Sequence, residues 1–115
     1  LRDIPFHSMC EHHLLPFFGV AHVGYKPNGK IVGAGKLVRA LEVLTRRPQL
    51  QERLTDQLAN VIFDTLEAEG VAVVIKAEHL CLSLREAQKS GTQVVTTATR
   101  GTIEEANLLS ILQCT

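Results

Sequence analysis

Aromatic side chains and a net charge of either sign are what this sequence lacks most. Its 115 residues include four Phe, one Tyr and no Trp, which argues against a stacking platform for single-stranded nucleic acid. Twelve basic and twelve acidic side chains cancel, so no overall field would attract DNA, RNA or an anionic membrane. The sequence therefore predicts no nucleic-acid partner, and an anionic ligand would have to be held by a local cluster.

Long apolar segments and a disulfide framework are also missing. No apolar run is long enough to span a bilayer and no signal-peptide pattern begins the chain, so we expect no membrane association. Three cysteines favour a reducing cytoplasm, in which thiols are kept for a metal. The length indicates one domain over residues 1–115, and the start at Leu1 rather than Met is expected of a trimmed chain that lacks an N-terminal part.

Hydrophobic periodicity predicts a mixture of strands and helices. The second helix rests on apolar residues that recur every four positions from Leu50 to Leu66, and Pro48 suits its first turn. The predicted elements are an extended entry and loop (1–13), a strand (14–26), a turn (27–30) and a short strand (31–33) that completes a hairpin, a helix (35–46), a second helix closed by Glu69-Gly70, strands over 71–84 and 93–99 with a turn at 90–91 between them, and a terminal helix (102–113).

Metal-binding side chains are concentrated in segment 8–13, which reads Ser-Met-Cys-Glu-His-His. Cys10 and His13 have the short separation that a single metal ion can bridge. Cys81 would complete a Cys2His set with an open fourth position, as catalytic zinc sites have. An isolated Cys-x-x-His pair could equally be a buried thiol beside solvated histidines, so the hypothesis depends on the second cysteine.

Two further histidines accompany these candidate ligands. Alternation along the strand predicted over 71–84 places His79, Cys81 and Arg85 on one side. A purely structural zinc site would need a fourth ligand, which His12 or His79 could supply. The same two histidines are suited to proton transfer at neutral pH, so spacing alone leaves a catalytic and a structural site open.

Charged residues near the starts of the first two predicted helices are candidates for ligand binding. Lys36 and Arg39 lie one turn apart behind a glycine-rich turn and, with Arg85, could bind phosphates. A solvated helix end explains the first two equally well. Gln51 and Glu52 fall in the first turn of the second helix, where the helix dipole favours a carboxylate. A carboxylate there could instead accept paired N–H bonds from a nitrogen-rich ring.

Four blocks of the sequence resemble GTP cyclohydrolase I. They read Ser-Met-Cys-Glu-His-His-Leu-Leu-Pro-Phe-Phe-Gly, Gly-Lys-Leu-Val-Arg, Arg-Arg-Pro-Gln-Leu-Gln-Glu-Arg-Leu and His-Leu-Cys-Leu, in order within residues 1–85. The resemblance implies an α+β tunnelling fold (T-fold), in which two long helices pack on one face of an antiparallel sheet. It also implies a homo-oligomer built of β-barrels, commonly a decamer of two pentamers, with active sites between subunits.

The same resemblance implies zinc-dependent conversion of GTP to 7,8-dihydroneopterin triphosphate and formate, in which zinc activates water for attack on C8 of guanine. Two histidines would assist ring opening and proton transfer. The positions carried over by motif are the zinc ligands Cys10, His13 and Cys81, the catalytic His12 and His79, the guanine-reading Glu52 with Gln51 beside it, and the triphosphate-binding Lys36, Arg39 and Arg85.

Two departures from the family pattern keep other functions open. Gly35 stands where the family usually has a serine near the phosphates, and Glu86 follows Arg85 where a glycine is usual. These changes favour a family member that acts on another purine or pterin, or a non-catalytic zinc-containing binding subunit. A zinc-stabilised interaction domain is a third hypothesis, which the complete set of ligands and spare histidines disfavours.

Overall fold

Four strands and two helices make up the part of the chain that the structure describes. The structure is a computed structural model, and it describes residues 1–80 and 92–102. The elements are β1 (Ile4–Met9), β2 (Pro16–Lys26), α1 (Ala34–Thr45), α2 (Gln51–Leu66), β3 (Gly70–His79) and β4 (Gln93–Gly101). Neighbouring strands are all antiparallel, in the order β1-β2-β3-β4. This arrangement confirms the predicted α+β class.

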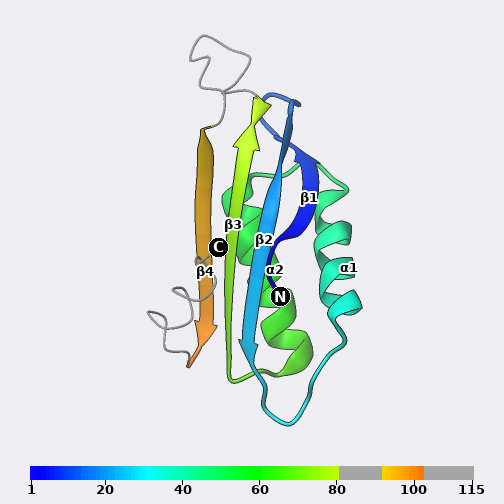
Figure 1. Cartoon of the computed structure of the whole chain (residues 1–115), viewed down its shortest axis with the longest axis vertical. Coiled ribbons are helices and arrows are strands. Elements are labelled where there is room, and N and C mark those ends of the chain that lie inside the picture. Colours follow the sequence, from blue (N-terminus) through cyan, green and yellow to red (C-terminus); the bar gives the residue numbers. More distant parts are fainter. Residues whose placement is uncertain (81–91, 103–115) are drawn as a thin grey trace.

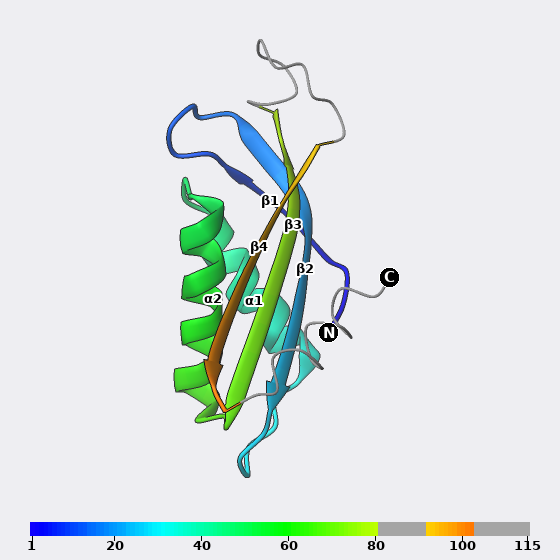
Figure 2. The same cartoon turned by 90° about the vertical axis from the view of Figure 1, so that its left-hand side faces the viewer.

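Both helices lie on the same face of the sheet, which Figure 2 shows nearly edge-on and Figure 1 face-on. Strand alternation explains this layering, because every second residue of a strand faces the same side. Phe17, Ala21 and Val23 of β2 are buried in one core cluster with Val73 and Ile75 of β3. Burying each large apolar side chain contributes about 1.5–3 kcal/mol, so this face is the main source of stability.

A four-residue apolar repeat gives α2 its buried face. Leu54, Leu58 and Ile62 are at most 2% exposed, and Leu66 ends the same stripe. α1 buries a matching row of leucines, so the two helices together close the core. The first two of the three predicted helices are confirmed. Their local apolar periodicity was enough to predict them.

The first hairpin forms from different strands than the sequence predicted. Residues 31–33 are not a strand, and β2 pairs instead with β1, across the loop at residues 10–15. Burial alternates strictly along β1, which is the mark of a strand with one face in the core. Proline is uncommon inside strands, but Pro5 is exposed in an outer strand of the described sheet, where proline is tolerated.

α2 also ends earlier than the predicted Glu69-Gly70 terminus. Leu66 is the last helical residue, and Glu67 takes a left-handed conformation with φ of 49°. Left-handed residues commonly end helices, and glycine is only the most frequent choice. Gly70 instead begins β3, after the Glu69 N–H donates to the Lys26 carbonyl at 2.9 Å.

Several sequence predictions fall on parts of the chain outside the described residues. These are residues 81–84 of the predicted strand, the turn at 90–91 and residues 103–113 of the predicted terminal helix. β4 confirms the strand predicted over 93–99. Among the helices that the structure describes, none has the length and apolar character needed to cross a membrane.

Candidate active site

Cys10 and His13 lie in a tight loop that connects β1 to β2. The Cys10 N–H donates to the Leu15 carbonyl and the Leu14 N–H donates to the Cys10 carbonyl, both at 2.8 Å. Leu14 has a left-handed φ of 54°, which helps to close the turn. Cys10 is buried, whereas His12 and His13 are exposed. The loop therefore holds one buried thiol beside two accessible imidazoles.

The two predicted zinc ligands of this loop are close enough to share one ion. Cys10 Sγ lies 4.0 Å from His13 Nδ1. Tetrahedral zinc, with Zn–S of about 2.3 Å and Zn–N of about 2.0–2.1 Å, places sulfur and nitrogen roughly 3.6 Å apart. The donor atoms thus fit zinc after a small movement of either side chain, and their nitrogen and sulfur chemistry is the kind that zinc prefers.

The third predicted zinc ligand, Cys81, and one predicted triphosphate-binding cation, Arg85, are outside the described residues. Within residues 1–80 and 92–102, no three His, Cys, Asp or Glu side chains are grouped so as to hold a metal ion. The Cys2His set therefore stays a prediction, of which the loop supplies two members.

The connection between α1 and α2 holds the loop from one side. The Gln49 N–H donates to the Met9 carbonyl at 2.8 Å, and the Glu11 N–H donates to the Gln49 carbonyl at 3.0 Å. These bonds form an isolated parallel bridge between Cys10 and Gln49. Arg53, in the first turn of α2, forms an ion pair with Glu11. The Cys-x-x-His segment is thereby connected to the helical layer.

His79 is the last residue of β3 and lies at the same end of the sheet as the loop (Figure 1). Strand pairing places it opposite Phe17, and the two rings stack with centroids 4.6 Å apart and planes within 4°. His79 Nε2 lies 2.6 Å from Gln51 Oε1. Burial lowers the pKa of His79, and the Glu52 carboxylate partly opposes this by raising it. A lowered pKa favours the neutral imidazole, which can both accept and donate a proton.

Gln51 and Glu52 begin α2, but their side chains have different surroundings. Gln51 is 2% exposed, and its amide nitrogen donates to the carbonyls of Ile75 and Val94. Glu52 is exposed and so is accessible to a ligand from solvent. The sequence placed both residues at the same ligand edge, whereas the structure directs the Gln51 amide into the sheet and toward His79.

Lys36 and Arg39 lie near the start of α1, far from the loop. Both side chains are exposed. α1 runs toward the loop end of the sheet (Figure 1), where Thr45 accepts a hydrogen bond from Ser8 at 3.0 Å. At 1.5 Å per residue, Lys36 lies about 14 Å along the helix from Thr45. Within one chain, the structure does not bring these two cations together with His79.

Four residues that support the site were not predicted from the sequence. Phe17 stood out only as a strand former, since its place opposite His79 depends on strand register. Gln49 carried no signal, because it acts through its backbone N–H and carbonyl groups. The opposite charges of Glu11 and Arg53 were a signal, but 42 residues separate them and no local pattern pairs them.

The fold is shared with a solved structure of low sequence similarity. The crystal structure of the archaeosine synthase QueF-Like in the apo form matches with a TM-score of 0.60 and 18% identity, over 86% of this chain and 89% of that chain. Together with the antiparallel sheet and the two helices on one face, this likeness confirms the T-fold class.

Sequence comparison identifies the family within this class. The family model for GTP cyclohydrolase I matches residues 1–111, and the chain belongs to that family. A GTP cyclohydrolase 1 of Streptococcus suis is 56% identical over 110 residues, which are 95% of this chain and 59% of the relative. One of Dehalococcoides mccartyi is 51% identical over 120 residues, covering 98% of this chain and 64% of the relative. The chain thus spans about three-fifths of the length of these relatives.

Proposed function

We propose that the chain is a single catalytic domain of a zinc-dependent, cytoplasmic GTP cyclohydrolase I. The reaction would convert GTP to 7,8-dihydroneopterin triphosphate and formate, as the first step of tetrahydrofolate or pterin biosynthesis. The observation that carries the proposal is the placement of Cys10 and His13, with donor atoms 4.0 Å apart, at the end of the sheet where His79 lies. Membership of the family supports the same chemistry.

Cys10, His13 and Cys81 would hold the zinc ion. When bound, zinc supplies a Lewis acid that lowers the pKa of water and makes a nucleophile for C8 of guanine available near neutral pH. The hydrogen bonds within the loop and the bridge from Cys10 to Gln49 support this assignment, because they hold the first two donors near each other before any ion binds.

His12 and His79 would move the protons that ring opening and formate release require. His12 lies between the two loop ligands in sequence and is exposed, so substrate can reach it. The stacked Phe17 ring and the Gln51 amide hold His79. A positioned acid or base typically contributes 10²- to 10⁴-fold to the rate, so loss of either imidazole should be measurable.

The substrate would be held by residues from two chains. The exposed carboxylate of Glu52 is suited to the paired N–H groups of the guanine edge. Lys36 and Arg39 lie near the start of α1, away from the loop, so a neighbouring copy would supply these two cations. Together with Arg85 they would bind the triphosphate. This requires a homo-oligomer, for which we propose a decamer of two pentamers.

Incubation of the zinc-loaded protein with GTP tests the proposal. We expect formate and a pterin chromophore, and we expect His12→Gln and His79→Gln each to lower kcat by at least about 100-fold. His7→Gln is the matched control, because His7 is exposed on β1 and should leave kcat unchanged. A protein that binds zinc stoichiometrically, forms a stable oligomer and releases no product would refute the proposed reaction.

A family member with a different purine or pterin substrate, or a non-catalytic binding subunit, is the alternative. Gly35 favours it, because packing does not explain the missing serine hydroxyl: a Cβ added at Gly35 would meet nothing within 4 Å. A panel of purine triphosphates under the same assay separates the cases. Turnover of another purine in preference to GTP supports a family member with a different substrate. Zinc binding without turnover of any purine supports a non-catalytic binding subunit.

A further inference from the structure

We propose that Gln51 is the positioning residue of His79, whose Nε2–H it accepts through Oε1, thereby fixing the tautomer and the orientation of the imidazole. The inference rests on the proposed function, in which His79 transfers protons. It assigns Gln51 a role different from direct contact with guanine. The contact that suggests it is the 2.6 Å separation between Gln51 Oε1 and His79 Nε2.

The surroundings of the Gln51 amide nitrogen determine which way the side chain points. Gln51 Nε2 lies 2.9 Å from the Val94 carbonyl oxygen and 3.2 Å from that of Ile75. Both partners are backbone carbonyls, which only accept hydrogen bonds, so the NH₂ group must face them. Oε1 then faces His79. Because an amide oxygen only accepts, the proton of this short contact belongs to His79 Nε2.

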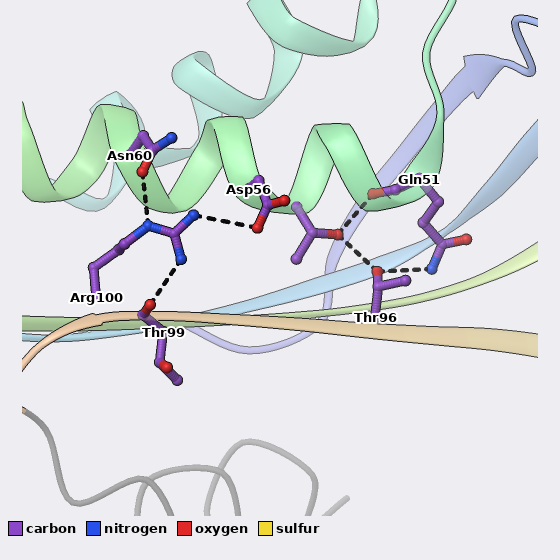
Figure 3. A network of polar contacts seen from close by, with 7 residues as sticks. Gln51, Asp56, Asn60, Thr96, Thr99 and Arg100 are labelled. Carbon is purple, nitrogen blue, oxygen red and sulfur yellow. Dashed lines mark hydrogen bonds and ion pairs between the residues drawn. The ribbon is translucent and has the colours of Figure 1, made fainter.

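A ring of hydrogen bonds prevents the amide from turning (Figure 3). Thr96 Oγ1 is a third acceptor of Gln51 Nε2, at 3.1 Å, so one of its two N–H groups is shared between two acceptors, and the Thr96 and Thr55 hydroxyls lie 2.6 Å apart. The Thr55 hydroxyl donates to the Gln51 carbonyl at 2.8 Å, so Thr96 must donate to Thr55. Gln51 and Thr55 are at most 2% exposed. An amide turned the other way would leave buried groups unpaired, at about 1–3 kcal/mol each.

Phe17 and Gln51 constrain the His79 ring in complementary ways. The stacked Phe17 ring sets the plane of the imidazole, and the hydrogen bond to Gln51 sets which edge of that plane carries each nitrogen. In the neutral ring, Nε2 then carries the proton and Nδ1 is the basic nitrogen. A protein that selects one tautomer spares the reaction the cost of doing so, which is the role of an orienting group beside a catalytic base.

A spectroscopic test reads the tautomer without any turnover. The zinc-loaded protein, labelled with ¹⁵N-histidine, is studied by long-range ¹H–¹⁵N correlation well above the ordinary histidine pKa of about 6.5. His79→Gln assigns the His79 signals. We expect His79 to be protonated at Nε2 in the parent protein and to become a mixture of tautomers in Gln51→Met. An Nδ1–H tautomer in the parent protein would overturn the inference, even if GTP proves not to be the substrate.

A kinetic test distinguishes positioning from substrate contact. Gln51→Met, close in size but without hydrogen-bonding groups, should lower kcat for GTP roughly 10- to 100-fold. This is less than the 10²- to 10⁴-fold that a positioned acid or base contributes, because the His79 imidazole is still present. KM should stay within about threefold, because uniform binding is not affected. A raised KM with unchanged kcat would show that Gln51 binds the substrate, and unchanged values of both would also contradict the inference.

Thr96→Val keeps the inference testable if Gln51→Met does not fold. It removes one acceptor of the Gln51 amide and one link of the hydroxyl ring at nearly constant shape. We expect a smaller loss of kcat in the same direction, with partial mixing of the His79 tautomers. Thr97→Val is the matched control, since Thr97 is the next residue of β4 and is exposed. Equal effects of the two threonine variants would contradict a specific role for the ring.

Discussion

His22 is a buried histidine of β2 that the proposed reaction does not use. It is fully buried, and its Nδ1 accepts the Asp3 N–H at 3.0 Å. Among the described residues, its Nε2 has no hydrogen-bond partner. Burial lowers the pKa of His22, the nearby Asp3 opposes this, and Lys76 and Arg2 lower the pKa further. In the neutral ring the proton is on Nε2, because Nδ1 accepts the Asp3 N–H. Protonation would add a proton to Nδ1 and break this hydrogen bond, so the folded state favours the neutral ring.

This lowered pKa makes stability depend on pH. Below about pH 6.5 the unfolded chain protonates His22 while the folded chain resists, so the free energy of unfolding should decrease as the pH falls through that value toward the lower folded pKa. The slope from one such group is at most about 1.4 kcal/mol per pH unit. Urea unfolding at a series of pH values measures it. His22→Leu should reduce the slope, and an undiminished slope in that variant would assign the effect to other groups.

Gly35 allows a direct test of what its missing hydroxyl does. Glycine in a helix costs about 1 kcal/mol relative to alanine and roughly half of that relative to serine. Because a Cβ at this position meets nothing, both Gly35→Ala and Gly35→Ser should raise the free energy of unfolding. If the triphosphate binds here, only the serine should also lower KM for GTP, by about tenfold, the value of one good hydrogen bond to a charged group. An equal KM in the two variants would place the triphosphate elsewhere.

At the scale of elements, the loop that carries Cys10 and His13 is held by the helical layer as well as by its own hydrogen bonds. The backbone of Gln49 and the side chain of Arg53 reach it from the connection and from the start of α2. β4 is connected to the same helix further along, where Arg100 donates to Asn60 at 2.7 Å and contacts Asp56 at 3.2 Å (Figure 3). α2 therefore contacts the loop of the candidate site through its first turn and β4 through Asp56 and Asn60.

The ion pair between Glu11 and Arg53 should contribute to zinc affinity. Both side chains are more than 40% exposed, and exposed pairs are worth up to about 1 kcal/mol. Arg53→Met should therefore weaken zinc binding by up to about fivefold, as measured by competition with a chelator. Glu11→Gln should do the same, and the double variant should add little.

The control for this pair lies at the other end of β2. Lys26 and Glu69 form an ion pair of similar exposure at 3.2 Å. Lys26→Met should leave zinc affinity unchanged. If it weakens zinc binding as much as Arg53→Met does, the effect comes from overall charge rather than from the loop contact.

The elements that sequence reasoning predicted correctly are those formed by local interactions. α2 is encoded by a repeat that returns every four residues, and nothing distant is needed to recognise it. β1 was missed because a strand is defined by its partner, and here the partner follows a loop that looks like a metal motif. Cys10 and His13 could be paired from their spacing alone, because they are close together in the sequence. The contact of His79 with Gln51 required knowledge of how β3 sits against α2.

At the scale of the whole molecule, the separation of the predicted substrate contacts within one chain is the main argument for assembly. His79 lies at the loop end of the sheet, and Lys36 lies near the opposite end of α1. A ring of copies in which each active site draws on two neighbours would bring such groups together. A decamer of the 12.6 kDa chain would have a mass of about 126 kDa.

Mixed oligomers test this sharing of active sites. Lys36→Ala and His79→Gln should each be nearly inactive alone. If each site takes Lys36 from one copy and His79 from its neighbour, an equal random mixture should restore about a quarter of the sites. The mixture is unfolded, refolded and assayed for formate. A chain that carries both substitutions, mixed with itself, is the control, and no recovery in the true mixture would place both residues in one subunit's site.

The bridge between Cys10 and Gln49 has a consequence for how the length of the chain can vary. One residue added to residues 46–50 would displace Gln49 by up to about 3.5 Å, which is more than a hydrogen bond tolerates. Met9 and Glu11 would then lose their partners. The exposed turn at residues 27–30 lies at the opposite end of the sheet and should accept extra residues readily. Insertions among relatives should therefore be found in that turn, while the connection from α1 to α2 keeps one length.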